Sequence, residues 1–169
     1  RFARPWSSPP EASVALSLTV PLPPESQRWG WLPLLTGLAV LDALGEVTGA
    51  PQRFALKWPN DVLAQDSDGA WAKICGILCE LAPGPDGMLV VAGVGVNVAL
   101  AREELPVPTA TSLTLAGFPR PGGGDVVVSI ARAFAARHAA WYAGSMADVR
   151  ATYRARCTTL GRDVAMHLP

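Results

Sequence analysis

The chain has 169 residues, of which half are hydrophobic and 17% are charged, and this suits one domain with a sizeable core. Its 14 basic and 14 acidic residues balance, and a chain without a basic excess is not expected to bind nucleic acid generally. The three cysteines include no CxxC pair, which argues against a zinc site or a disulfide framework and favours a reducing, cytoplasmic setting.

Apolar periodicity in the first half of the chain predicts one long helix among short strands. Pro33 is compatible with the first turn of that helix, and Gly49 and Pro51 are expected to end it. A polar hairpin turn is expected at 65–69. The expected elements are a strand over 13–20, a helix over 26–47, and strands over 54–58 and 62–64.

The second half opens with two nearly continuous apolar runs, at 72–81 and 88–99, which predict strands buried on both faces. Residues 102–124 are expected to be irregular apart from a helical turn over 111–117, and Asp125 can then cap a helix. The remaining expected elements are helices over 125–142 and 147–156 and a strand over 163–168.

Short connections between several of these strands favour an α/β (α+β) fold with a mixed, largely antiparallel sheet flanked by helices. The apolar stretch at 29–44 contains Pro33 and Asp42 and is short for a bilayer span, so no membrane contact is expected. The sequence begins without Met and shows no signal peptide, which suggests a fragment of a longer protein.

The most informative segment is Lys57-Trp58-Pro59-Asn60-Asp61, which apolar residues enclose on both sides. The proline fixes the local backbone, so the turn is expected to present the Asn60 amide and the Asp61 carboxylate together. Lys57 can meet a phosphate, and Asp61 can hold a metal ion or accept from a ligand donor. A strand-end turn with polar surface residues explains these five residues equally well.

Two later segments add candidate residues. Lys73 lies in an apolar strand, where its amine either reaches solvent or serves a buried anion, and Gly76 lets a ligand approach the backbone. The strand Gly93-Val94-Gly95-Val96-Asn97 lacks the third glycine of a dinucleotide fingerprint, and Asn97 needs a polar partner. A core strand with one satisfied asparagine also fits that segment.

At the N-terminus, Arg1 and Arg4 lie in a Pro-flanked loop with Trp6. Two arginines there can close over an anion and the indole can stack on a base, but an exposed terminus gives the same pattern. The sequence contains no P-loop, no metal-ligand spacing and no hydrolase triad motif.

Together these segments resemble the biotin–protein ligase family in order and spacing, and Ala110-Thr111-Ser112-Leu113 resembles a family segment that follows them. The resemblance implies a class II synthetase-like, lipoate ligase-like catalytic domain over 1–158, with the start of a small C-terminal β-barrel at 159–169. It implies that biotin and ATP are the substrates, that Mg²⁺ assists, and that a biotin carboxyl carrier domain of a carboxylase receives the biotin.

The resemblance also implies roles for matching residues. Arg1 and Arg4 look like the last arginines of a loop that closes over biotinyl-AMP. Lys57 and Lys73 are expected to converge, from adjoining β-segments, around one acyl-adenylate, and Asp61 would order the nucleotide site or its metal. The implied catalytic residues are Lys73, Arg1 and Arg4, the implied biotin-binding residues are Arg1, Lys73, Gly76 and Leu78, and the implied ATP-binding residues are Trp6, Lys57, Asn60, Asp61 and Asn97.

Two other hypotheses stay open. One is a lipoate or octanoyl ligase or transferase of the same broad fold, against which Asn60-Asp61 directly after Trp58-Pro59 argues. The other is a non-catalytic remnant that binds biotin or a nucleotide, which the truncated ends of the chain motivate.

Overall fold

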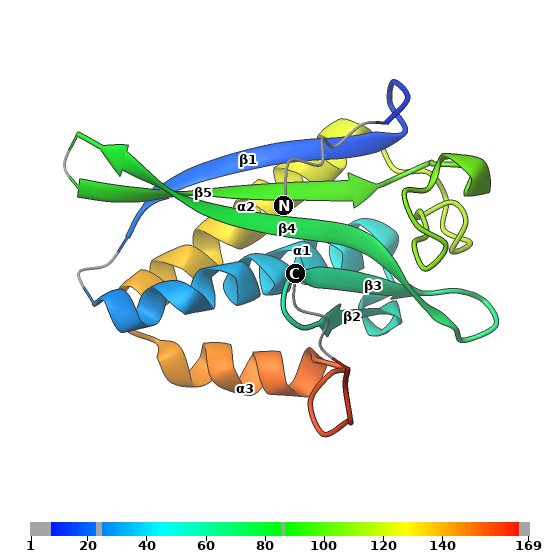
Figure 1. Cartoon of the computed structure of the whole chain (residues 1–169). Coiled ribbons are helices and arrows are strands. Elements are labelled where there is room, and N and C mark those ends of the chain that lie inside the picture. The colour runs from blue at the N-terminus through cyan, green and yellow to red at the C-terminus, as the bar shows by residue number, and fades with distance from the viewer. Residues whose placement is uncertain (1–7, 23–24, 86, 166–169) are drawn as a thin grey trace.

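Five strands form one sheet, and the helices lie on one side of it (Figure 1). The computed structural model describes residues 8–22, 25–85 and 87–165. The strands are β1 (Ser13–Pro21), β2 (Phe54–Lys57), β3 (Asp61–Gln65), β4 (Trp71–Gly84) and β5 (Gly87–Asn97). Their order in the sheet is β1-β5-β4-β3-β2, and each pair of neighbours is antiparallel. The predicted antiparallel sheet with flanking helices is therefore confirmed.

Helices cover one face of this sheet. The helical elements are η1 (Ser26–Trp31), α1 (Leu32–Thr48), η2 (Pro51–Arg53), η3 (Arg102–Glu104), α2 (Gly123–Tyr142) and α3 (Met146–Arg156). Helices α1 and α2 pack side by side under the strands, and α3 lies against α1 on the side of β2 (Figure 1). Leu35, Leu38 and Leu44 of α1 are fully buried, because this helix packs against the sheet and both other helices.

The segment Ser26–Thr48 has 23 residues and a hydropathy of 1.3, so by length and composition it could cross a bilayer. This segment extends beyond the apolar stretch at 29–44 at both of its ends. However, 61% of its apolar window is buried inside the fold, as in the core helix of a folded domain. The buried leucines of α1 account for its apolar character.

The two faces of the sheet carry different residues. Buried apolar side chains, among them Val14, Ile77 and Val94, point toward the helices. Neighbours in register on the other face form a row of small and polar residues, which we call the open-face row: Ala15, Gly95, Gly76, Asp61 and Lys57. Burial on both faces is therefore contradicted for β4 and for the first part of β5, whereas residues 94–97 of β5 are buried on both faces. Glycines made these strands look uniformly apolar, and Leu78 on the open face is 39% exposed.

Several element ends differ from the prediction. The expected helix over 26–47 begins as the short turn η1, and Pro33 then lies in the first turn of α1, as predicted. Helix α2 starts at Gly123, so Asp125 is not its N-cap but lies in its first turn, where a carboxylate complements the helix dipole.

Toward the C-terminus, the helical turn expected near 111–117 is present, with the Ala116 amide 2.9 Å from the Ser112 carbonyl. Residues 163–165 form no strand, and the rest of the strand predicted over 163–168 lies outside the described residues. The domain boundary predicted after residue 158 stays a prediction.

Candidate active site

The turn between β2 and β3 holds the polar segment 57–61 against the central strand β4. The Trp58–Pro59 peptide bond is cis. The Asn60 carbonyl accepts a hydrogen bond from the Ile77 amide at 2.9 Å, and its Nδ2 donates to the Ile77 carbonyl at 2.7 Å. Asn60 is thus bonded to β4 through both its backbone and its side chain, while its Oδ1 acceptor has no hydrogen-bond partner in the described part of the chain.

A β-bulge brings Lys73 onto the open face. Val62 pairs with Cys75, but the next residue, Leu63, pairs with Lys73, so Ile74 is the extra residue of β4. Strict alternation would place Lys73 and Gly76 on opposite faces, since three positions separate them. The extra residue places Lys73 on the same face as Gly76. There the Lys73 ammonium forms an ion pair with Asp61, whose Oδ1 atom is buried.

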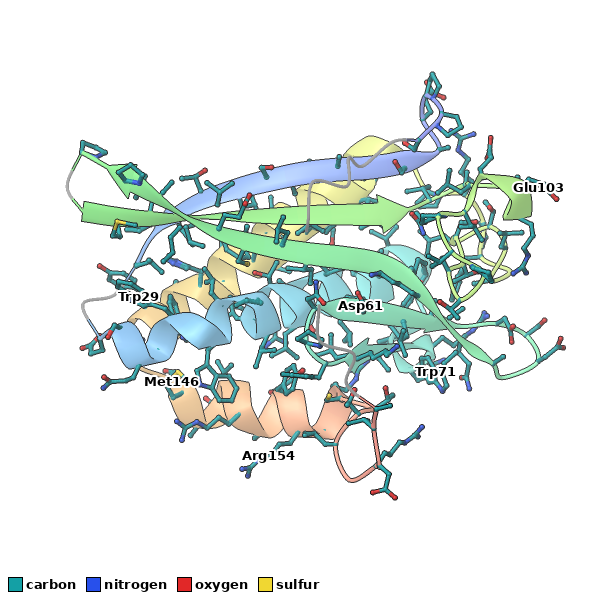
Figure 2. All side chains as sticks on the ribbon, in the orientation of Figure 1. Trp29, Asp61, Trp71, Glu103, Met146 and Arg154 are labelled. Carbon is teal, nitrogen blue, oxygen red and sulfur yellow. The ribbon has the colours of Figure 1, made fainter. Side chains whose placement is uncertain are left out.

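Lys57 and Lys73 are the only two lysines among 14 basic residues, and they lie on either side of one carboxylate. Lys57 is exposed and pairs in register with Asp61, which in turn contacts Lys73. The two lysines are not on adjoining strands, because β3 lies between β2 and β4. Figure 2 shows Asp61 near the middle of the molecule, well away from Trp71 and Glu103 at one end of the sheet. The two lysines therefore lie on either side of Asp61, and the meeting of their amines around one ligand stays a prediction.

Asn97, at the end of β5, is only 3% exposed. Its Nδ2 donates to the Thr111 carbonyl at 2.9 Å, but its buried Oδ1 has no hydrogen-bond partner among the described residues. Buried polar atoms are nearly always paired, so this acceptor indicates a missing donor from water or a ligand.

The segment 109–111 takes the place of β5 beside the start of β4. The Lys73 amide donates to the Thr109 carbonyl at 2.9 Å, and the Thr111 amide donates to the Lys73 carbonyl at 2.7 Å. The Thr111 carbonyl of the same segment accepts a hydrogen bond from Asn97 Nδ2. The segment at 110–113, singled out by resemblance, therefore joins the backbone of Lys73 to the side chain of Asn97.

The open-face row offers a flat, narrow surface next to the lysines. Gly76 pairs with Gly95, which pairs with Ala15, so no side chain larger than a methyl group rises from these three positions. In the next row, Leu78 pairs with Gly93. A hollow of about 10 Å³ at the turn, lined by Lys57, Asn60 and Asp61 together with residues of α1, is far smaller than the roughly 300–1,000 Å³ of ligand pockets. The open face is the surface left for a ligand of nucleotide size.

The thiols near this surface are not activated. Burial raises the pKa of Cys75 far above its ordinary value, and the nearby Lys73 ammonium offsets this only in part. Burial raises the pKa of Cys79 to about 11, and a hydrogen bond with Thr36 opposes the shift. Both thiols are protonated at neutral pH and are therefore poor nucleophiles and poor metal ligands.

The described residues contain no group of three or more His, Cys, Asp or Glu side chains that could hold a metal ion. Asp61 is the one carboxylate in the open-face row. A single carboxylate together with phosphate oxygens is a usual environment for Mg²⁺. Asp61 thus fits a nucleotide-bound Mg²⁺ and not a cation held by protein alone.

The structure brings together many of the predicted site residues. Lys57, Asn60 and Asp61 lie in one turn, Lys73 and Gly76 face them from β4, and Leu78 follows one row further along. Asn97 lies beyond them at the end of β5 and reaches Lys73 through the segment 109–111. Arg1, Arg4 and Trp6 lie outside the described residues.

Sequence reasoning missed Thr158 and Thr159, which follow α3 and bind the turn between β2 and β3. The Trp58 amide donates to Thr159 Oγ1 at 2.9 Å, and Thr158 bonds to the Leu56 carbonyl. No local pattern marks these two threonines, because their partners lie about a hundred residues away in the sequence.

Comparisons with known proteins show which sequences and folds this chain is similar to. No protein-family model matches the chain. The chain is 39% identical to the biotin–[acetyl-CoA-carboxylase] ligase of Mycobacterium tuberculosis over 171 aligned residues, which cover the whole chain and 60% of that protein. The chain thus spans less than two thirds of this relative.

Solved structures have the same fold. A biotin protein ligase from Aquifex aeolicus in complex with biotin and ATP is 29% identical, with a TM-score of 0.75 over 96% of this chain and 65% of that one. A biotin protein ligase from Leishmania major in complex with biotin is 22% identical and shares the fold, with a TM-score of 0.74 over 100% of this chain and 70% of that one. From the match along its whole length and the shared sheet with its helices, we conclude that the chain belongs to the biotin–protein ligase family.

Proposed function

We propose that this chain provides the catalytic site of a biotin–protein ligase, which joins biotin to a lysine of a biotin carboxyl carrier domain at the expense of ATP. The observation that supports this most directly is the placement of both lysines of the chain around Asp61, on a sheet face lined by glycine. Two cations beside a flat apolar strip suit a ligand with an apolar body and a phosphate-bearing end.

In the first step, a carboxylate oxygen of biotin attacks the α-phosphorus of ATP. The bond from that phosphorus to the oxygen bridging to the β-phosphate breaks, and pyrophosphate leaves with the electron pair. No side-chain nucleophile is needed, which agrees with the protonated thiols of Cys75 and Cys79. The enzyme's task is to offset negative charge where carboxylate and phosphate meet.

Lys73 is the residue we propose for that task. Its side chain is 36% exposed, so its amine can reach a ligand on the open face while Asp61 holds it in position. One preorganised donor of this kind stabilises a transition state by roughly 3 kcal/mol. Gly76 and Leu78, on the same strand, would then line the biotin site.

The nucleotide is proposed to lie toward the turn between β2 and β3. The exposed ammonium of Lys57 and the free Oδ1 of Asn60 are available there. The unpaired Oδ1 of Asn97 offers a third contact, to a donor of the nucleotide. Asp61 would hold Mg²⁺ jointly with the phosphates, and that ion would neutralise phosphate charge.

In the second step, the neutral amine of the carrier lysine attacks the carbonyl carbon of biotinyl-AMP. The bond between that carbon and the phosphate oxygen breaks, AMP leaves, and the nitrogen loses a proton to solvent. The anhydride is prone to hydrolysis, so a cover over the open face is expected. Arg1, Arg4 and Trp6 remain our proposal for that cover.

Biotin-dependent exchange of pyrophosphate into ATP tests the proposal, measured in the full-length protein and in its Lys73→Ala variant. We expect exchange in the parent and a loss of about a hundredfold or more in the variant. Arg154→Ala is the matched control, because it removes a cation from the solvent side of α3 (Figure 2) and should leave exchange unchanged.

The outcomes separate the alternatives. Exchange that depends on lipoate or octanoate in place of biotin would identify a different acyl ligase. Calorimetric binding of biotin or ATP without any exchange would identify a non-catalytic binding protein. Undiminished exchange in the Lys73→Ala variant would remove Lys73 from the mechanism.

A further inference from the structure

The segment 156–159, directly after α3, runs along the outer edge of β2. The Arg156 Nη2 group donates to the Phe54 carbonyl at 3.0 Å. The Thr158 amide and Oγ1 both donate to the Leu56 carbonyl, at 2.8 and 3.0 Å. The segment therefore acts as an added edge strand, parallel to β2 through the bridge between Leu56 and Cys157. We call it the edge segment.

The last contact of the edge segment reaches the turn that carries the candidate nucleotide ligands. Thr159 Oγ1 accepts a hydrogen bond from the Trp58 amide at 2.9 Å. Lys57 thus lies between two residues that the edge segment binds, Leu56 and Trp58. On the far side of the turn, Asn60 is bound to Ile77 of β4. The turn is attached at both ends, to two parts of the chain that are distant in sequence.

The other half of the candidate site does not depend on the edge segment. Lys73, Gly76 and Leu78 belong to β4, which is held between β3 and β5 in the interior of the sheet. Loss of the Thr159 contact would therefore change the position of Lys57 and leave the β4 residues in place.

We propose that Thr159 is a positioning residue that sets Lys57 for the nucleotide and so affects the use of ATP and not that of biotin. This inference rests on the proposed function. The hydroxyl acts through the Trp58 amide and needs no contact with substrate. It links the chain that follows α3 to the phosphate end of the site.

The test is steady-state pyrophosphate exchange in the full-length protein, with ATP and biotin varied separately. Thr159→Val keeps the size of the side chain but removes the acceptor, whereas Thr159→Ser keeps the acceptor. The net value of one hydrogen bond corresponds to about a two- to tenfold change in an equilibrium constant. We expect Thr159→Val to raise the KM for ATP by that factor with the KM for biotin unchanged, and Thr159→Ser to restore the parent value.

Thr48→Val is the matched control, because the Thr48 hydroxyl at the end of α1 also accepts a hydrogen bond from a backbone amide, that of Ala50 at 3.4 Å, and donates to the Leu44 carbonyl. It should change neither KM. An unchanged KM for ATP in Thr159→Val would overturn the inference, and so would an equal rise in both KM values, which would indicate general loosening of the fold.

Hydrogen exchange of the Trp58 amide provides a readout that needs no activity. We expect its protection to fall in Thr159→Val and to persist in Thr159→Ser, while the Ile77 amide stays protected in both. Equal protection of the Trp58 amide in the parent and in both Thr159 variants would overturn the inference, even if the parent catalyses pyrophosphate exchange. A parent protein without exchange activity would instead refute the proposed function, and the amide data would still decide whether Thr159 holds the turn.

Discussion

Removal of the Asp61 charge tests how firmly Lys73 is held on the open face. Asp61→Asn keeps the shape of the side chain but ends the ion pair, and Lys73→Met removes the other partner. The Lys73→Met change should cost more stability, because it leaves a carboxylate with a buried Oδ1 unpaired, whereas the lysine of Asp61→Asn can still reach water.

The magnitude follows from the exposure of the two side chains, which is 36% for Lys73 and 18% for Asp61. Exposed pairs contribute about 0.2–1 kcal/mol, whereas removal of one partner of a fully buried pair costs about 3–5 kcal/mol. This pair lies between those limits, so we expect a coupling energy of about 1–2 kcal/mol. With a urea dependence of about 2 kcal/mol per M, one such loss lowers the unfolding midpoint by about 0.5–1 M.

Urea unfolding of the parent, the two single variants and the double variant gives this coupling as a double-mutant cycle. The same cycle on Arg132 and Glu46, whose side chains are 65% and 57% exposed, is the control and should give less than about 1 kcal/mol. A coupling near zero for Asp61 and Lys73, or one no larger than the control, would refute the argument that Asp61 fixes the lysine.

Three further predictions concern packing, a buried amide and a thiol. Gly45→Ala places a methyl group 2.8 Å from Pro51 Cβ and should lower the free energy of unfolding by about 1–3 kcal/mol, whereas Gly30→Ala meets nothing within 4 Å and should be close to neutral in the same urea titration. Asn97→Ala removes a buried bond to a backbone carbonyl and should cost about 1–3 kcal/mol in thermal unfolding, together with a higher KM for ATP. Because the Cys79 pKa is raised to about 11, its alkylation by iodoacetamide should be slow at pH 7 and should rise about tenfold per pH unit up to that value; a rate that levels off below pH 9 would contradict this.

Much of the architecture could be predicted from local sequence patterns. Alternation over 13–20 predicts β1, and the leucine-rich stretch up to Gly49 predicts α1, because periods of two and of 3.6 residues are local properties. The polar segment 57–61 could also be recognised, since its proline and flanking apolar residues lie within a few positions of it.

The features that complete the site depend on contacts between distant segments. The bulge at Ile74 changes the face on which Lys73 lies, and one extra residue in an apolar run leaves no trace in the periodicity. The pairing of 109–111 with Lys73 and that of Thr159 with Trp58 join residues that are far apart in the sequence. Glycine in β4 and β5 also concealed the difference between a covered and an open face.

The central claim is that Lys57 and Lys73 meet one ligand, and the composition of the chain allows a direct measurement. Reductive methylation with ¹³C-formaldehyde retains the charge of each amine, and the signals of these two lysines are identified by their loss in Lys57→Arg and Lys73→Arg variants of the full-length protein. We predict that biotin together with ATP shifts both signals in the full-length protein, and that biotin alone shifts the Lys73 signal more than that of Lys57. If saturating biotin and ATP leave either signal unmoved, the two lysines do not share a ligand and the account is contradicted.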